Sequence, residues 1–106
     1  MNYSVNWSKN AEKDLISIIE YLLENWGKNS ASKFNDKLKK QIQLITTFPK
    51  IFPKTSFLSN LRKCVVVKQV SLYYLENEES KEIRIIRLLD NRSDLNLIIS
   101  ELDKID

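Results

Sequence analysis

The chain has 106 residues, of which 42% are hydrophobic and 29% are charged, and its formal net charge is +3 at pH 7. This length and composition indicate one globular domain over residues 1–106 and exclude a disordered or multidomain chain. With no histidine and one cysteine, Cys64, the sequence excludes an intramolecular disulfide, histidine-dependent nucleophilic catalysis and an ordinary zinc site. We therefore expect a cytoplasmic protein that uses no metal and no cofactor and does not cross a membrane.

The first half of the chain predicts one short strand followed by two amphipathic helices. Apolar and polar residues alternate over residues 3–7, which indicates a half-buried strand. Apolar residues then recur at spacings of three and four over residues 9–26, which predicts a helix that a glycine ends. A second apolar stripe predicts a helix capped by Asn29 or Ser30 and stopped by Pro49. The short link between the helices makes them an antiparallel hairpin.

The second half predicts a small sheet. Three runs rich in β-branched and aromatic residues read as consecutive antiparallel strands, namely Arg62–Lys68, Val70–Glu76 and Glu82–Leu89. Residues 95–102 then suggest a short helix or a docking tail. The order β-α-α-β-β-β predicts an α+β domain in which a helical hairpin packs on one face of an antiparallel sheet. We expect the other face to be exposed and to carry several basic side chains.

The side chains of the last two strands are expected to alternate between these faces. In the last strand, Ile83 and Ile85 are placed on the face opposite to Ile86 and Leu88. In the middle strand, Tyr73 and Tyr74 point to opposite faces. We expect Tyr74 to be the buried one, because it shares its face with an apolar neighbour, and this leaves Tyr73 for stacking or for contact with a partner.

Several short motifs follow one another along the chain. They are Tyr3-x-Val5-x-Trp7-Ser8-x-x-Ala11-x-x-Asp14-Leu15, the stretch from Tyr21 to Ala31 with Phe34, Leu61-Arg62-Lys63-Cys64-Val65-Val66, Leu72-Tyr73-Tyr74, Ile83-Arg84-Ile85 and Asp90-Asn91-Arg92-x-Asp94. Together they resemble the RelE/ParE superfamily, the toxins of bacterial type II toxin–antitoxin systems. The resemblance covers nearly the whole chain, and the order and spacing of the motifs are more specific than any one of them.

The resemblance implies a toxin that is neutralised by a cognate antitoxin in a hetero-oligomer. RelE-type members cut mRNA on the ribosome with basic residues of the sheet and a tyrosine near the C-terminus, whereas ParE-type members act on DNA gyrase. The last tyrosine of this chain is Tyr74, in the middle strand, so the late tyrosine is missing and the chain is closer to the ParE-like branch. This implies inhibition of an essential target by protein binding rather than by catalysis. The antitoxin segment is expected to be acidic and amphipathic and to be encoded beside this gene.

The residues expected to contact the target or the antitoxin are mainly basic side chains of the three predicted strands and the segment after them. They are Arg62, Lys63, Lys68, Tyr73, Arg84, Arg87, Asn91 and Arg92. The plainer interpretation of the basic residues is a solvated sheet face whose charges discourage edge pairing.

Two further functions stay open. One is a ribosome-dependent mRNA endonuclease, in which Lys68, Arg84 and Arg92 would be the catalytic candidates, with lysine as the base and arginine stabilising the phosphate charge. The other is a non-toxic member of the superfamily that is retained as a binding module.

Overall fold

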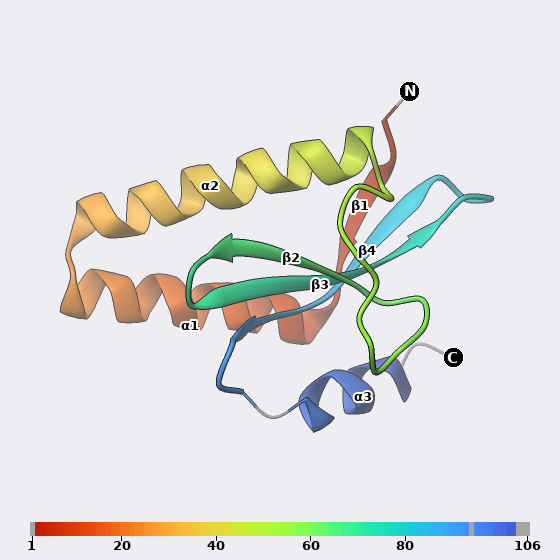
Figure 1. The fold of residues 1–106 in the computed structure, drawn as a ribbon. Helices are drawn as coiled ribbons and strands as arrows, with labels where there is room; N and C mark the ends of the chain where they lie inside the picture. Colours follow the sequence, from red (N-terminus) through yellow and green to blue (C-terminus); the bar gives the residue numbers. More distant parts are fainter. Residues whose placement is uncertain (1, 94, 104–106) are drawn as a thin grey trace.

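A computed structural model describes residues 2–93 and 95–103, and it confirms the α+β fold (Figure 1). Asp94 lies outside the described residues, so part of the last motif is not placed. The elements in chain order are β1 (Ser4–Trp7), α1 (Lys9–Asn25), α2 (Lys28–Thr47), β2 (Arg62–Val67), β3 (Val70–Asn77), β4 (Glu82–Asp90) and α3 (Asn96–Asp103).

The four strands form one sheet in the order β1-β4-β3-β2. The pairs β2–β3 and β3–β4 are antiparallel, as predicted for the C-terminal strands. The first strand is different, because β1 pairs with β4 in parallel, so the sheet is mixed rather than wholly antiparallel. The helical hairpin lies between β1 and the other strands in the sequence, and a connection of this length lets β1 run in the same direction as β4.

The helical hairpin is fixed by a cap at its start and a glycine at its turn. The Ser8 hydroxyl accepts a hydrogen bond from the Ala11 backbone N–H at 3.0 Å, which caps the first turn of α1. Gly27 separates the helices at a φ of 89°, a conformation that side-chain-bearing residues rarely adopt. The second helix therefore begins at Lys28, slightly before the predicted caps Asn29 and Ser30.

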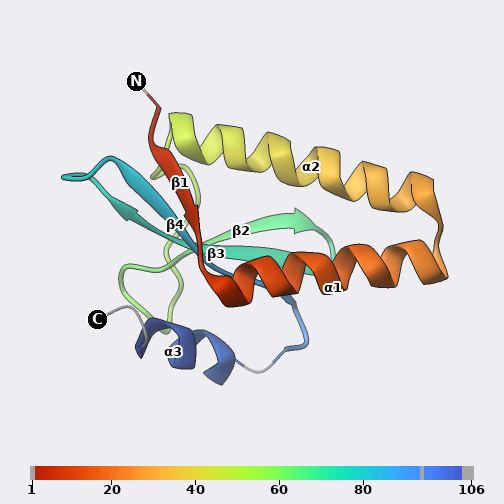
Figure 2. The ribbon, with the colours of Figure 1, turned by 180° about the vertical axis from the view of Figure 1, so that it is seen from behind.

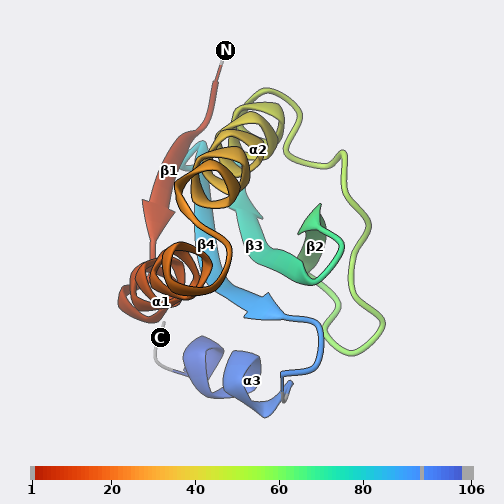
Figure 3. The same ribbon diagram turned by 90° about the vertical axis from the view of Figure 1, so that its left-hand side faces the viewer.

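The main core lies between the helical hairpin and one face of the sheet. It includes Phe34 and Leu38 of α2 and Leu72 and Tyr74 of β3. Tyr74 is fully buried, as expected, and its hydroxyl donates to the Pro49 carbonyl at 2.8 Å. Figure 3 looks along α1 and α2, with the strands spread side by side in the order β1, β4, β3 and β2 and the connection after α2 passing outside β2.

The opposite face of the sheet is not the exposed basic surface that we predicted. A second cluster of buried residues, Leu61, Tyr73, Ile86, Leu89 and Ile98, covers part of it. The last of these comes from α3, which lies on the other side of the sheet from α2 (Figures 1 and 2). The prediction was wrong because the apolar residues of the C-terminal segment return to the sheet and bury its second apolar face.

A register shift in β4 also breaks the predicted alternation. The pairing of β3 with β4 shifts between Tyr73 and Tyr74, so β4 contains one extra residue at this point. Leu88 therefore joins Ile85 in the main core, while Ile86 faces the second cluster. The prediction that Ile86 and Leu88 share a face was wrong for this reason.

Candidate functional site

Three of the predicted contact residues form internal contacts of the fold. Arg62 is 8% exposed, and its Nε donates to Glu76 Oε1 at 2.7 Å. Its Nη1 donates to the Phe52 carbonyl at 2.7 Å and to the Lys50 carbonyl at 3.3 Å. Arg62 therefore holds the connection between α2 and β2 against the sheet. Tyr73 is 4% exposed in the second cluster, and burial raises the pKa of its hydroxyl.

Arg87 is the third of these residues, and it joins α1 to β4. Its Nε and Nη2 donate to the two carboxylate oxygens of Asp14 at 2.7 and 2.8 Å. The same carboxylate accepts the Leu88 backbone N–H at 3.1 Å. The hydrogen bonds from Arg87 to Asp14 raise the pKa of the guanidinium. Asp14 thus accepts a backbone hydrogen bond that a neighbouring strand would otherwise accept, because β1 has already ended at this point of β4.

Three other predicted residues, Lys68, Asn91 and Arg92, come together at one end of the sheet and are exposed. Asn91 links the β2–β3 turn to the end of β4, because its backbone N–H donates to Gln69 and its side-chain amide donates to the Lys68 carbonyl, both at 2.8 Å. Arg92 Nε lies 3.1 Å from Asp90 Oδ1, and this contact lowers the pKa of Asp90 and raises that of Arg92.

A groove of about 570 Å³ opens beside this end of the sheet, and we refer to it as the hairpin groove. One wall comes from α1 and the start of α2, and the other from the ends of the strands. It is lined by Ser17, Ile18, Tyr21, Leu22, Trp26, Ser30, Phe34, Val67, Gln69, Val70, Asp90 and Arg92. The lining is mainly apolar, with charge at one rim. A concave apolar surface of this kind suits the apolar face of a partner helix.

Two large aromatic residues of the hairpin groove are largely exposed. The exposed fractions are 68% for Trp26 and 59% for Tyr21. Trp26 ends the apolar stripe of the helix predicted over residues 9–26, and that pattern by itself predicts a packing residue. The structure places it at the last residue before Gly27, where the helix has passed beyond the sheet. Its position at the helix end was the signal that could have separated it from the core residues.

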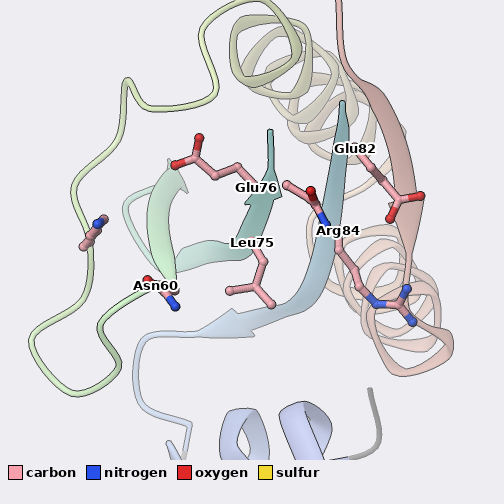
Figure 4. Close-up of a pocket in the computed structure, with 7 residues that line it drawn as sticks. Asn60, Leu75, Glu76, Glu82 and Arg84 are labelled. Carbon is pink, nitrogen blue, oxygen red and sulfur yellow. The ribbon is translucent and has the colours of Figure 1, made fainter. Parts of the chain in front are cut away.

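Lys63 and Arg84 lie apart from this cluster and are both partly exposed. Arg84 pairs with Leu75 and lines a separate pocket of about 350 Å³ under the connection after α2. Figure 4 shows its guanidinium extending away from Glu76, which lines the same pocket. Arg84 Nε and Glu76 Oε2 are both buried and have no hydrogen-bond partner among the described residues.

The three residues considered for RNA cleavage do not form one site. Lys68 and Arg92 are neighbours through Asn91. Arg84 lies six residues before Asp90 on β4, a distance of about 20 Å along an extended strand. No group of three or more His, Cys, Asp or Glu residues that could hold a metal ion occurs in the part of the chain that the structure describes. Within residues 2–93 and 95–103, no helix is long and apolar enough to cross a membrane.

Comparison with known proteins identifies similar sequences and folds. A family model described as the ParE toxin of the type II toxin–antitoxin system parDE matches residues 5–95. No curated protein matches the sequence.

Among solved structures, the chromosomal ParDE toxin–antitoxin system of P. aeruginosa contains a chain that is 20% identical, with a TM-score of 0.69 over 83% of this chain and 95% of that one. A mutant of the E. coli toxin RelE in the free state is 16% identical, with a TM-score of 0.70 over the full length of both chains. The toxin–antitoxin complex RelBE2 of Mycobacterium tuberculosis contains a chain that is 15% identical, with a TM-score of 0.62 over 86% of this chain and all of that one.

Proposed function

Because this chain belongs to the ParE toxin family of type II toxin–antitoxin systems, we propose that it inhibits an essential target by protein binding and that a cognate antitoxin neutralises it. DNA gyrase is the target that we propose. The antitoxin segment binds in the hairpin groove and blocks access to the exposed end of the sheet, where Lys68, Asn91 and Arg92 lie.

The observation that carries this proposal is the exposure of Trp26 and Tyr21 over an apolar groove. Tryptophan and tyrosine are enriched among residues that dominate binding energy, because they bury a large area at a small entropic cost. An amphipathic helix would place its apolar side chains between them. Arg92 lines the groove beside Asp90, and Lys68 lies in the chain between the lining residues Val67 and Gln69. Their positive charges favour acidic residues on the polar side of that helix.

Binding rather than catalysis is favoured by the arrangement of the polar side chains. RNA cleavage needs a base, an acid and groups that stabilise phosphate charge at one place. Lys68 and Arg92 are neighbours, but Arg84 lies about 20 Å away along β4. The sequence has no tyrosine after Tyr74, which is buried in the main core.

The test is induced expression of the chain in a bacterium, with growth, DNA supercoiling and mRNA integrity measured in the same cells. We expect growth arrest with altered supercoiling and intact mRNA, and recovery when the adjacent antitoxin gene is co-expressed. Arrest with codon-phased cleavage of mRNA would instead assign ribosome-dependent endonuclease activity, with Lys68 and Arg92 as the first residues to replace. Normal growth would contradict the toxin function and leave a binding module.

A further inference from the structure

The outer surface of α2 is strongly basic. The helix carries five lysines and one acidic residue, Asp36. All six of these side chains are exposed. Lys33, Lys37 and Lys40 are spaced by four and three residues, so they lie on one side of the helix, and we refer to them as the lysine strip. The strip spans about 10 Å along the helix axis.

The position of the lysine strip is fixed by the next turn of the helix. Gln41, four residues after Lys37, donates its side-chain amide to the Val65 carbonyl of β2 at 3.1 Å. The strip therefore borders the β2 side of α2. It is distinct from the hairpin groove, which is lined by Ser30 and Phe34 of the same helix.

The charge of the lysine strip is only partly offset, because Asp36, three residues after Lys33 and four before Lys40, leaves a net charge of +2 on these four side chains. Within the described residues, no carboxylate lies within 4.0 Å of the ammonium groups of Lys33, Lys37 or Lys40, whereas Arg62 and Arg87 each have an acidic partner. Like charges at spacings of three and four repel each other and destabilise the helix that carries them. A surface that keeps three such lysines is suited to an anionic partner.

We propose that the lysine strip binds the phosphodiester backbone of duplex nucleic acid, a function beyond the proposed toxin activity. Side chains around the strip are polar and exposed, among them Asn29, Ser32 and Gln43. A protein partner would need an apolar centre to its interface, and lysine is depleted from such interfaces. A row of lysines without apolar neighbours matches instead the sequence-independent contacts that proteins make with phosphates.

The experiment measures how binding to plain duplexes depends on salt. The full chain is titrated against a fluorescent DNA duplex and an RNA duplex of about 20 base pairs each, which exceeds the 30 Å length of α2. The test variant is Lys33→Gln/Lys37→Gln/Lys40→Gln. The matched control, Lys9→Gln/Lys13→Gln/Lys54→Gln, removes the same charge from other exposed lysines. Glutamine has nearly the same helix propensity as lysine, so both variants should fold.

Each lost phosphate contact should lower the slope of log K against log salt by about 0.9, so the test variant should lose about 2.7 and the control much less. Binding of DNA alone, RNA alone or both, with this difference in slope, supports the proposal and identifies the nucleic acid. Equal slopes for the two variants would overturn it. Absence of duplex binding at low salt would also overturn the proposal. If the chain then bound polyglutamate, and the test variant bound it more weakly than the control, the lysine strip would be assigned to an acidic protein partner instead.

Discussion

Replacing Asp14 with alanine should destabilise the fold more than any surface substitution. The Asp14 carboxylate accepts two hydrogen bonds from Arg87 and one from the Leu88 backbone N–H. The side chains of Arg87 and Asp14 are only 13% and 14% exposed. Asp14→Ala therefore leaves a guanidinium and a backbone donor largely out of water without their acceptor.

Removing one member of a buried pair costs about 3–5 kcal/mol, and the remaining exposure of this pair places the expected loss near the lower end, at about 3 kcal/mol. In a domain of this size, 1 kcal/mol corresponds to a shift in Tm of about 4–8 °C, so Asp14→Ala should lower Tm by about 15 °C. The assay is urea unfolding at pH 7 followed by tryptophan fluorescence, with thermal unfolding as a second measurement.

The control is the other Asp–Arg pair, at the end of β4. Asp90 and Arg92 are also within hydrogen-bond distance, but their side chains are 39% and 92% exposed. Asp90→Ala should therefore cost less than about 1 kcal/mol. Equal losses for the two variants, or a loss below about 1 kcal/mol for Asp14→Ala, would refute the reasoning that burial makes the Asp14–Arg87 pair important.

Three further predictions concern single positions. Burial raises the pKa of the Cys64 thiol to about 12, so an aromatic disulfide reagent at pH 8 should label this thiol only as fast as the protein unfolds. Fast labelling of the native protein would contradict the burial of Cys64 in the main core. Gly27→Ala should lower the free energy of unfolding by about 1–2 kcal/mol through its φ of 89° alone, since nothing lies within 4 Å of an added Cβ. Gly27→Asn should be little better than alanine, because the ψ of Gly27 is 177°, outside the left-handed helical region that asparagine tolerates. An unchanged unfolding midpoint for the alanine variant would show that the turn has another conformation. Ile98→Ala should cost about 2–4 kcal/mol and Ile99→Ala less than about 0.5, since these residues are 0% and 43% exposed, and similar losses would argue against the docking of α3 on the sheet.

Much of the fold was predictable because its signals are local. The alternation of apolar residues and the spacing of three and four placed every helix and strand close to its observed bounds; β2, for example, was predicted at Arg62–Lys68 and lies at Arg62–Val67. The glycine and proline that bound α2 act through their own backbone conformations. Such features do not depend on distant parts of the chain.

The errors concern contacts between segments that are far apart in the sequence. The parallel pairing of β1 with β4 depends on the path of the whole chain between them. The sequence could not show that Ile98 returns to the sheet and covers Tyr73, or that one extra residue in β4 changes the face of Leu88. Each of these is decided by which partner the segment finds, and a pattern within the segment does not contain that information.

The candidate site was only partly predictable, because residue types can be read from the sequence but contacts between distant segments cannot. Basic residues were recognised by type, but the sequence did not indicate that Arg62 and Arg87 have buried acidic partners, Glu76 and Asp14. The place of Trp26 at the end of α1 was a signal that it could leave the core, but the sequence did not indicate that it lines a groove with residues more than 40 positions later. The hairpin groove exists only after α1, α2 and the strand ends have come together.

The most direct test of the proposed function is the affinity of the chain for the cognate antitoxin that we propose. The variants to compare are Trp26→Ala, in the hairpin groove, and Phe48→Ala, an aromatic residue at the opposite end of α2 that is 58% exposed. Neither change should lower the free energy of unfolding by more than about 0.5 kcal/mol, because both side chains are exposed. We predict that Trp26→Ala weakens antitoxin binding by at least about 30-fold, the effect of losing a dominant aromatic contact, while Phe48→Ala leaves it within about twofold of the original chain. Unchanged binding by Trp26→Ala would contradict the assignment of the hairpin groove as the antitoxin site.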